Sequence, residues 1–91
     1  MRRSFDGATV VVSGAGNGLG RTLALRFARG GARIVALDRD PGAAAAVTVE
    51  LAQAGFEALG CSCDVTDANA CQAAIEATVA RFGRIDVLVN N

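Results

Sequence analysis

A glycine-rich stretch between an apolar run and a helical pattern constrains the fold more than any other part of the sequence. It reads SGAGNGLG at residues 13–20, and residues 9–12 before it are Thr-Val-Val-Val. Apolar residues follow at the spacing of one helix face: Leu19, Leu23, Ala24, Phe27 and Ala28. A strand that turns through glycines into a helix leaves backbone N–H groups free at the helix start. These groups and the helix dipole favour a bound phosphate.

The spacing of the glycines separates the known phosphate-binding loops. The fingerprint G-x-G-x-x-G would need a third glycine at the position of Leu19. A P-loop would need glycine and lysine where the chain has Ala15 and Arg21. With Gly16 as an extra glycine, the pattern that fits is G-x-x-x-G-x-G on Gly14, Gly18 and Gly20. A glycine-rich loop without a ligand is the alternative, but the flanking strand and helix favour a nucleotide site.

The rest of the chain repeats the order of strand and helix. Strands are predicted at residues 8–13, 33–38, 57–63 and 85–90, and helices at 18–29, 41–54 and 67–82. Apolar strands with short helical connections indicate a parallel sheet with right-handed crossovers. We therefore expect one α/β domain over residues 1–91, the N-terminal βαβαβαβ portion of a doubly wound Rossmann-type sheet with strand order 3-2-1-4.

The apolar spacing also predicts which side of each helix faces the sheet. The inward residues would be Val47, Leu51 and Ala54 in the second helix, and Cys71, Ile75, Val79 and Phe82 in the third. Asp40 with Pro41, and Thr66 or Asp67, are expected to begin these helices. Because the third helix alone would cover the second face, valines of strands one and four should face water, and strand four should be an unpaired edge.

The composition restricts the chemistry that the chain can perform. All nine basic residues are arginine, and histidine, tyrosine and lysine are absent. Carboxylates, thiols and hydroxyls therefore make up the chain's own catalytic inventory. The formal net charge is zero, which argues against nucleic acid or an anionic membrane as partner. Arg2-Arg3 faintly resembles a twin-arginine export signal, but the following apolar run is too short, so we expect a cytoplasmic protein.

The three cysteines Cys61, Cys63 and Cys71 are an odd number in a chain without a secretory signal. Reduced thiols are therefore expected. Cys61 and Cys63 would share one face of a strand. Without histidine or a fourth thiol, a tetrahedral zinc site within one chain is improbable, and buried small apolar side chains are the better interpretation.

An acidic residue ends the second predicted strand. Asp38 follows Gly14 by 24 residues, near the distance at which a carboxylate accepts from the ribose hydroxyls of adenosine. Its charge would repel a 2′-phosphate, which favours NAD over NADP. Arg39 weakens this inference because arginine can pair with that phosphate. A solvated acid in a turn is the alternative for Asp38.

Three motifs in order resemble those of the short-chain dehydrogenase/reductase family. Residues 13–20 resemble its TGxxxGxG cofactor loop, with Ser13 for the usual threonine. Asp64-Val65 resembles its adenine-pocket pair, and residues 83–91, GRIDVLVNN, resemble the segment that leads into its NNAG motif. The resemblance covers the whole chain.

This resemblance implies the NAD(P)-binding half of an oxidoreductase that moves a hydride between a nicotinamide and an alcohol or carbonyl substrate. The implied cofactor contacts are Gly14, Asn17, Gly18, Leu19 and Gly20 at the pyrophosphate and adjoining ribose, Asp38 with Arg39 at the adenosine ribose, Asp64 and Val65 at the adenine, and Asn91 near the ribose. Asp64 could instead shape the turn before the third helix, and Asn90 and Asn91 could simply end a strand.

The family's catalytic asparagine, serine, tyrosine and lysine follow the NNAG motif, beyond Asn91. The resemblance therefore implies that residues 1–91 alone are inactive, and that the complete protein is a homo-oligomeric enzyme. Two alternatives remain: a non-catalytic module for adenine dinucleotides, and a methyltransferase-like sheet that binds S-adenosylmethionine. The glycine spacing and the residues before Asn91 argue against the second.

Overall fold

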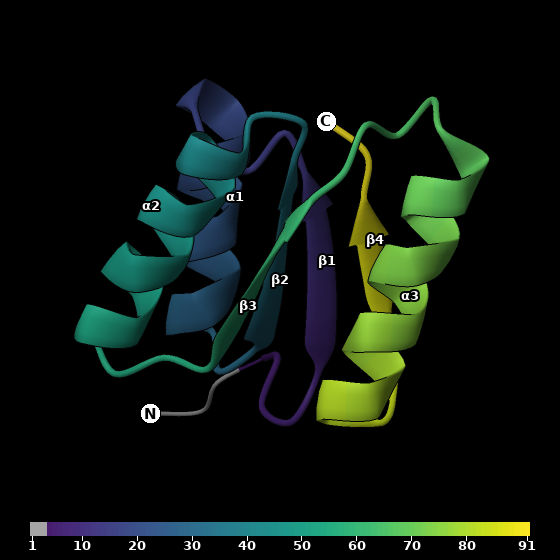
Figure 1. The fold of residues 1–91 in the computed structure, drawn as a ribbon. Helices are drawn as coiled ribbons and strands as arrows, with labels where there is room; N and C mark the ends of the chain where they lie inside the picture. The colour runs from purple at the N-terminus through teal and green to yellow at the C-terminus, as the bar shows by residue number, and fades with distance from the viewer. Residues whose placement is uncertain (1–3) are drawn as a thin grey trace.

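Residues 4–91 are described by a computed structural model, so the Arg2-Arg3 pair lies outside the described residues. Strands and helices alternate as β1 (Thr9–Ser13), α1 (Gly18–Arg29), β2 (Arg33–Asp38), α2 (Pro41–Gln53), β3 (Ala58–Ser62), α3 (Ala68–Phe82) and β4 (Val87–Val89). All strands are parallel, in the order β3-β2-β1-β4 (Figure 1). The predicted α/β class and strand order are confirmed.

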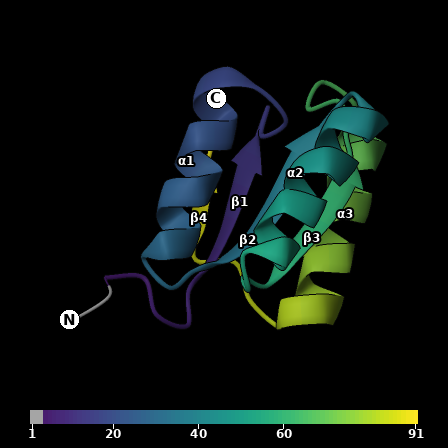
Figure 2. The same cartoon turned by 90° about the vertical axis from the view of Figure 1, so that its left-hand side faces the viewer.

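The sheet lies between two helical layers. Helices α1 and α2 cover one face and α3 covers the other (Figures 1 and 2). Side chains of β1 alternate between the layers: Val10 and Val12 pack with α1 and α2, whereas Val11 packs in the α3 layer. Every residue of β1 is buried, as expected for a central strand. Within residues 4–91, no helix has the length and apolar character needed to span a bilayer.

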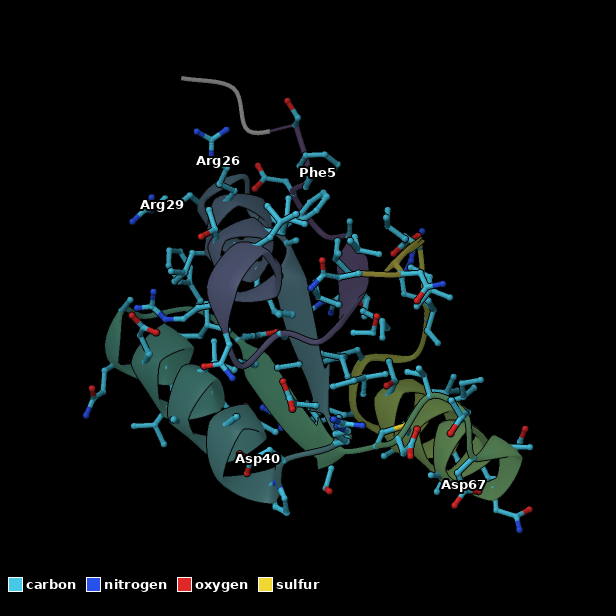
Figure 3. The ribbon with its side chains drawn as sticks, turned by 90° about the horizontal axis from the view of Figure 1, so that it is seen from above. Phe5, Arg26, Arg29, Asp40 and Asp67 are labelled. Atoms are coloured by element: carbon cyan, nitrogen blue, oxygen red, sulfur yellow. The ribbon has the colours of Figure 1, made fainter. Side chains whose placement is uncertain are left out.

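Aspartates begin α2 and α3 in the predicted way (Figure 3). The Asp40 carboxylate accepts from the N–H groups of Gly42 at 2.9 Å and Ala43 at 3.4 Å. Asp67, rather than Thr66, caps α3 by accepting from the second and third N–H groups of that helix. Each cap satisfies N–H groups that have no partner within the helix.

The predicted inward faces of the helices are wrong in part. In α3 the buried residues are Ala74, Thr78 and Phe82, whereas Ile75 and Val79 are about half exposed. The physical reason is the position of α3, which contacts β2 and β3, so that Ile75 lines a groove toward Ile85 and Leu88 instead of packing on the sheet.

Helices α1 and α2 also differ from the prediction in part. Helix α1 buries Gly20, Ala24 and Ala28, and Leu19 is 65% exposed. Ala54, expected to face inward, is exposed because α2 ends at Gln53. Val47 and Leu51 are buried as predicted.

Strand β4 is shorter than expected, and its surroundings differ from the prediction. Helix α3 contacts β2 and β3, and Leu88 of β4 is 67% exposed on the same side. In β1 the expectation of an exposed valine is wrong, because Val11 is only 6% exposed. Val87 and Val89 are half-buried against the α1 and α2 layer. Among the strands, the large apolar residue exposed on the α3 side is therefore Leu88 and not a valine.

Candidate functional site

The glycine turn lies at the carboxyl ends of the strands, between β1 and α1 (Figure 1). Gly14 and Gly18 have φ angles of 62° and 54°, in the left-handed region that favours glycine. A Cβ on Gly20 would overlap the carbonyl oxygen of Gly14. The three glycines of the predicted pattern therefore have separate backbone reasons to lack a side chain.

The start of α1 is open in a way that the other helix starts are not. Asn17 is the N-cap residue, but its side chain makes no cap hydrogen bond. Gly18 and Leu19, the first two residues of the helix, are exposed. Since α2 and α3 have aspartate caps, α1 is the described helix whose N-terminus can offer N–H groups to an anion.

Gly16, treated in the sequence as an extra glycine, has a definite place. A Cβ there would overlap the Cβ of Ala43 and would lie 2.8 Å from Oδ2 of Asp38. Its N–H group donates to the same Asp38 oxygen at 3.0 Å. In the sequence, the only sign of this contact is that residue 43 is a small alanine. The contact itself depends on the position of α2 beside the glycine turn.

The Asp38 carboxylate is fixed at the end of β2. Its Oδ2 accepts from the N–H of Gly16, and its Oδ1 accepts from the N–H of Asp40 at 3.0 Å. Asp38 is half-buried. A carboxylate held at both oxygens by backbone groups keeps one orientation and can still accept from a hydroxyl at its remaining lone pairs.

Asp64 shapes the turn between β3 and α3. Its Oδ1 accepts from the Thr66 hydroxyl at 2.7 Å and from the Thr66 N–H at 2.9 Å. These hydrogen bonds, the hydroxyl first, lower the pKa of the Asp64 carboxyl below its ordinary value. The turn role weighed for Asp64 is thus observed, while its contact with an adenine stays a prediction. Val65 beside it is 53% exposed.

Ser13 joins the glycine turn to the segment after β4, a role that the sequence did not reveal. Its hydroxyl accepts from the N–H of Asn91 at 3.0 Å and lies 3.3 Å from the carbonyl oxygen of Val89, to which it can donate. Asn91 also packs against Gly14, where a Cβ would lie 3.0 Å from its amide nitrogen. A hydroxyl residue at the end of a buried strand was the available signal.

Most of the predicted site residues meet at one cleft of about 280 Å³. The residues that line it are Ser13, Gly14, Asp38, Arg39, Cys63, Asp64, Val65, Thr66 and Asn91. Asn17, Gly18, Leu19 and Gly20 are outside this lining and form the adjacent start of α1. The arrangement offers carboxylates to hydroxyls and N–H groups to an anion, so its chemistry is that of binding. Among residues 4–91, no three His, Cys, Asp or Glu side chains are grouped to hold a metal ion.

Comparison with known proteins identifies the family. The short chain dehydrogenase family model matches residues 8–91. The chain is 37% identical over 87 residues to 7alpha-hydroxysteroid dehydrogenase of Escherichia coli strain K12, and 43% identical over 87 residues to D-threitol dehydrogenase of Mycolicibacterium smegmatis. Each alignment covers 96% of this chain and 34% of the relative. The chain therefore belongs to the short chain dehydrogenase family.

A solved structure agrees with this assignment. It is a 7 alpha-hydroxysteroid dehydrogenase in complex with NADH and 7-oxo glycochenodeoxycholic acid. The TM-score is 0.94 at 36% identity, over 99% of this chain and 35% of that one. The present chain thus spans about a third of the length of the relatives it matches.

Proposed function

We propose that this chain is the nicotinamide-dinucleotide-binding part of an oxidoreductase that acts on a CH–OH or carbonyl group. The observation that carries the proposal is the placement of the open α1 N-terminus and the fixed Asp38 carboxylate at adjacent strand ends. The turn also leaves room for a ligand, because its backbone excludes side chains at Gly14 and Gly20. When bound, the nicotinamide would supply or accept the hydride.

Each part of the cleft has a proposed role. Exposed N–H groups of Gly18 and Leu19 would bind the pyrophosphate. Asp38 would accept from the adenosine ribose hydroxyls, and Asp64 and Val65 would border the adenine. Asn91 would approach the ribose from the other side of Gly14. These roles use backbone groups and side chains that already line one cleft or its edge.

We further propose NAD as the cofactor in preference to NADP. A fixed carboxylate at the end of β2 repels a 2′-phosphate, and both of its oxygens are held in place. Arg39 lines the same cleft and is the residue that would oppose this preference. Support for NAD chemistry comes from the NADH complex of the related 7 alpha-hydroxysteroid dehydrogenase.

The substrate class follows from the relatives alone. Hydroxysteroid and threitol dehydrogenases are both named for an alcohol substrate. We propose an alcohol or its carbonyl counterpart as substrate of the complete protein. The catalytic residues would come from the part of the family sequence that follows Asn91.

Calorimetry with two adenosine ligands tests the binding proposal. We expect ADP-ribose to bind more tightly than S-adenosylmethionine, because the α1 N-terminus matches a pyrophosphate that S-adenosylmethionine does not have. Circular dichroism would first establish that the chain is folded. Tighter binding of S-adenosylmethionine would contradict the proposal and favour the methyltransferase-like alternative.

A further inference from the structure

Two of the three cysteines lie in contact beside the cleft. Cys63 follows the end of β3, and Cys71 lies in the first turns of α3. The Cys63 thiol donates to the Cys71 sulfur at 3.9 Å, and the Cys71 thiol donates to the carbonyl oxygen of Val65 at 3.5 Å. The proposed function uses neither thiol. Cys63 nevertheless lines the cleft, next to Asp64.

We propose that Cys63 and Cys71 form a reversible disulfide when the protein meets a peroxide. A disulfide needs its sulfurs about 2.05 Å apart, so these two must approach by about 1.9 Å. Rotation of the two side chains and a small movement of the first turn of α3 can supply that approach. Oxidation would then link the end of β3 to the start of α3 across the turn that contains Asp64 and Val65.

The sulfur contact recorded among the described cysteines joins Cys63 and Cys71, not Cys61. Cys61 lies two residues before Cys63, so the two Cα atoms are about 6.6 Å apart along the strand. Their side chains are parallel rather than directed at each other. The geometry therefore singles out one pair among the three cysteines.

The burial of the two thiols sets the order of the chemistry. Cys71 is half-buried and Cys63 is 3% exposed. Burial, together with the contacts to Cys71, raises the pKa of the Cys63 thiol, so it stays protonated longer. The peroxide therefore reacts first at Cys71.

The reaction consumes one peroxide and releases two waters. The Cys71 thiolate attacks one peroxide oxygen, the O–O bond breaks, and the departing hydroxide takes up a proton. Cys71 is now a sulfenic acid. The Cys63 sulfur loses its proton and attacks the Cys71 sulfur, the S–O bond breaks, and the second water leaves. The two thiols are oxidised by two electrons and the peroxide is reduced by two.

Oxidation should weaken ligand binding in the cleft, a consequence that rests on the proposed function. The disulfide removes the S–H that Cys71 donates to Val65, and it pulls on the turn that holds Asp64. We expect the displaced turn to lower the affinity about three- to tenfold, which is the effect of losing roughly one hydrogen bond to the ligand. ADP-ribose is the suitable probe because it has no nicotinamide for peroxide to attack.

Peptide mapping of the full chain tests whether the disulfide forms. The protein is treated with hydrogen peroxide, blocked with an alkylating agent and cut before aspartate. Cleavage before Asp64 and Asp67 separates Cys63 from Cys71, so their peptides stay joined only through a disulfide. We expect the joined peptides in the wild type and in Cys61→Ser, and their return to separate peptides after reduction. Absence of joined peptides, with each thiol oxidised separately, would overturn the proposal.

Calorimetry with ADP-ribose tests the consequence. Cys71→Ser keeps a hydroxyl that can donate to Val65, so its affinity should equal that of the reduced wild type before and after peroxide. Wild type and Cys61→Ser should lose affinity about three- to tenfold after peroxide and regain it on reduction. An equal loss of affinity in Cys71→Ser would show that the Cys63–Cys71 disulfide does not cause the loss. Failure of the reduced wild type to bind ADP-ribose would instead refute the proposed function, leaving peptide mapping to decide the disulfide.

Discussion

The Asp38 carboxylate connects three parts of the structure through its two oxygens. It ends β2, accepts from Gly16 in the glycine turn, and accepts from Asp40 at the cap of α2. A change at this position therefore alters both the position of the turn and the charge of the cleft. Asparagine separates the two effects only in part, because it removes the charge and keeps one oxygen acceptor, while its NH2 group cannot accept from the second N–H.

Replacement of Asp38 should change cofactor choice as well as affinity. Asp38→Ala removes a charge-assisted hydrogen bond of about 1.5–3 kcal/mol, so NAD affinity should fall about tenfold or more. NADP, freed from repulsion, should lose less affinity or gain some. Asp38→Asn, which removes the charge and keeps one of the two oxygen acceptors, should show the change of preference with the smaller loss. Equal losses for both cofactors in calorimetry would show that Asp38 does not contact the ribose.

Gly20 provides a test of the turn that does not depend on a ligand. Gly20→Ala places a methyl group against the Gly14 carbonyl oxygen. This oxygen belongs to the backbone, so it cannot rotate away as a flexible side chain could. Overpacking of this kind costs about 1–3 kcal/mol in the free energy of unfolding. Urea unfolding, followed by circular dichroism, measures the loss. An unchanged midpoint would show that the turn has more room than the structure gives it.

At the scale of single residues, sequence patterns predicted backbone requirements better than contacts. The three glycines and Asp38 were predicted from spacing, because a tight turn leaves few residue types possible. Ser13 and Gly16 gained their roles from partners in distant segments, Asn91 and Ala43. Spacing within one segment contains no information on such partners.

The helices and strands show a similar division. Their order, type and approximate limits follow from periodicity and from the caps at Asp40 and Asp67. The inward faces were harder to predict, since periodicity gives weight to large apolar residues such as Ile75. The buried side of α3 is instead formed by Ala74, Thr78 and Phe82, and Ile75 lines the groove beside β4. Which side of the helix is buried depends on which strands it contacts, a tertiary property.

Strand β4 is attached to β1 partly through a side chain. Asp86 Oδ2 accepts from the N–H of Thr9 at 2.8 Å, and Oδ1 accepts from Arg84 at 2.6 Å. The Arg84 guanidinium, followed by the Thr9 N–H, lowers the pKa of the Asp86 carboxyl below its ordinary value. The ionised side chain therefore holds the first residues of this strand pair together.

This attachment predicts a pH dependence of stability. A carboxyl whose pKa is lower in the folded state stabilises the fold above its unfolded pKa of about 3.9. That contribution is lost as the pH falls through the lower, folded value. Asp86→Asn should therefore reduce the urea midpoint at pH 7 and have a smaller effect at pH 3. Glu76→Gln, whose contact is with neutral Gln72, is the control and should show no such difference. A constant effect of Asp86→Asn at both pH values would contradict the prediction.

At the scale of the whole molecule, the α3 side of the sheet is incompletely covered. A groove of about 430 Å³ lies there, with Leu88, Ile85 and Ile75 among its mostly apolar lining. Exposed apolar side chains of this size each forgo about 1.5–3 kcal/mol of burial, against a domain stability of about 5–15 kcal/mol. β4 is also an edge strand of the described sheet.

Residues 1–91 expressed alone should consequently be loosely packed and should associate through β4. Sedimentation velocity should show species larger than a monomer, and Leu88→Arg should shift them toward the monomer. No turnover of a carbonyl substrate with NADH is expected, since tyrosine and lysine are absent from these residues. A sharp cooperative melt from a strict monomer would contradict the packing prediction, and measurable turnover would contradict the expected inactivity.

The hydrogen bonds of Ser13 have a consequence for biosynthesis. A ribosome makes Ser13 early, but its partners Val89 and Asn91 are translated more than seventy residues later. Translation proceeds at about 5–20 residues per second, so several seconds pass between the synthesis of the glycine turn and that of the strand that completes it. A nascent chain in this interval has an unfinished ligand cleft. A ligand that needs the completed cleft is therefore expected to stabilise the finished fold rather than to guide the first stages of its assembly.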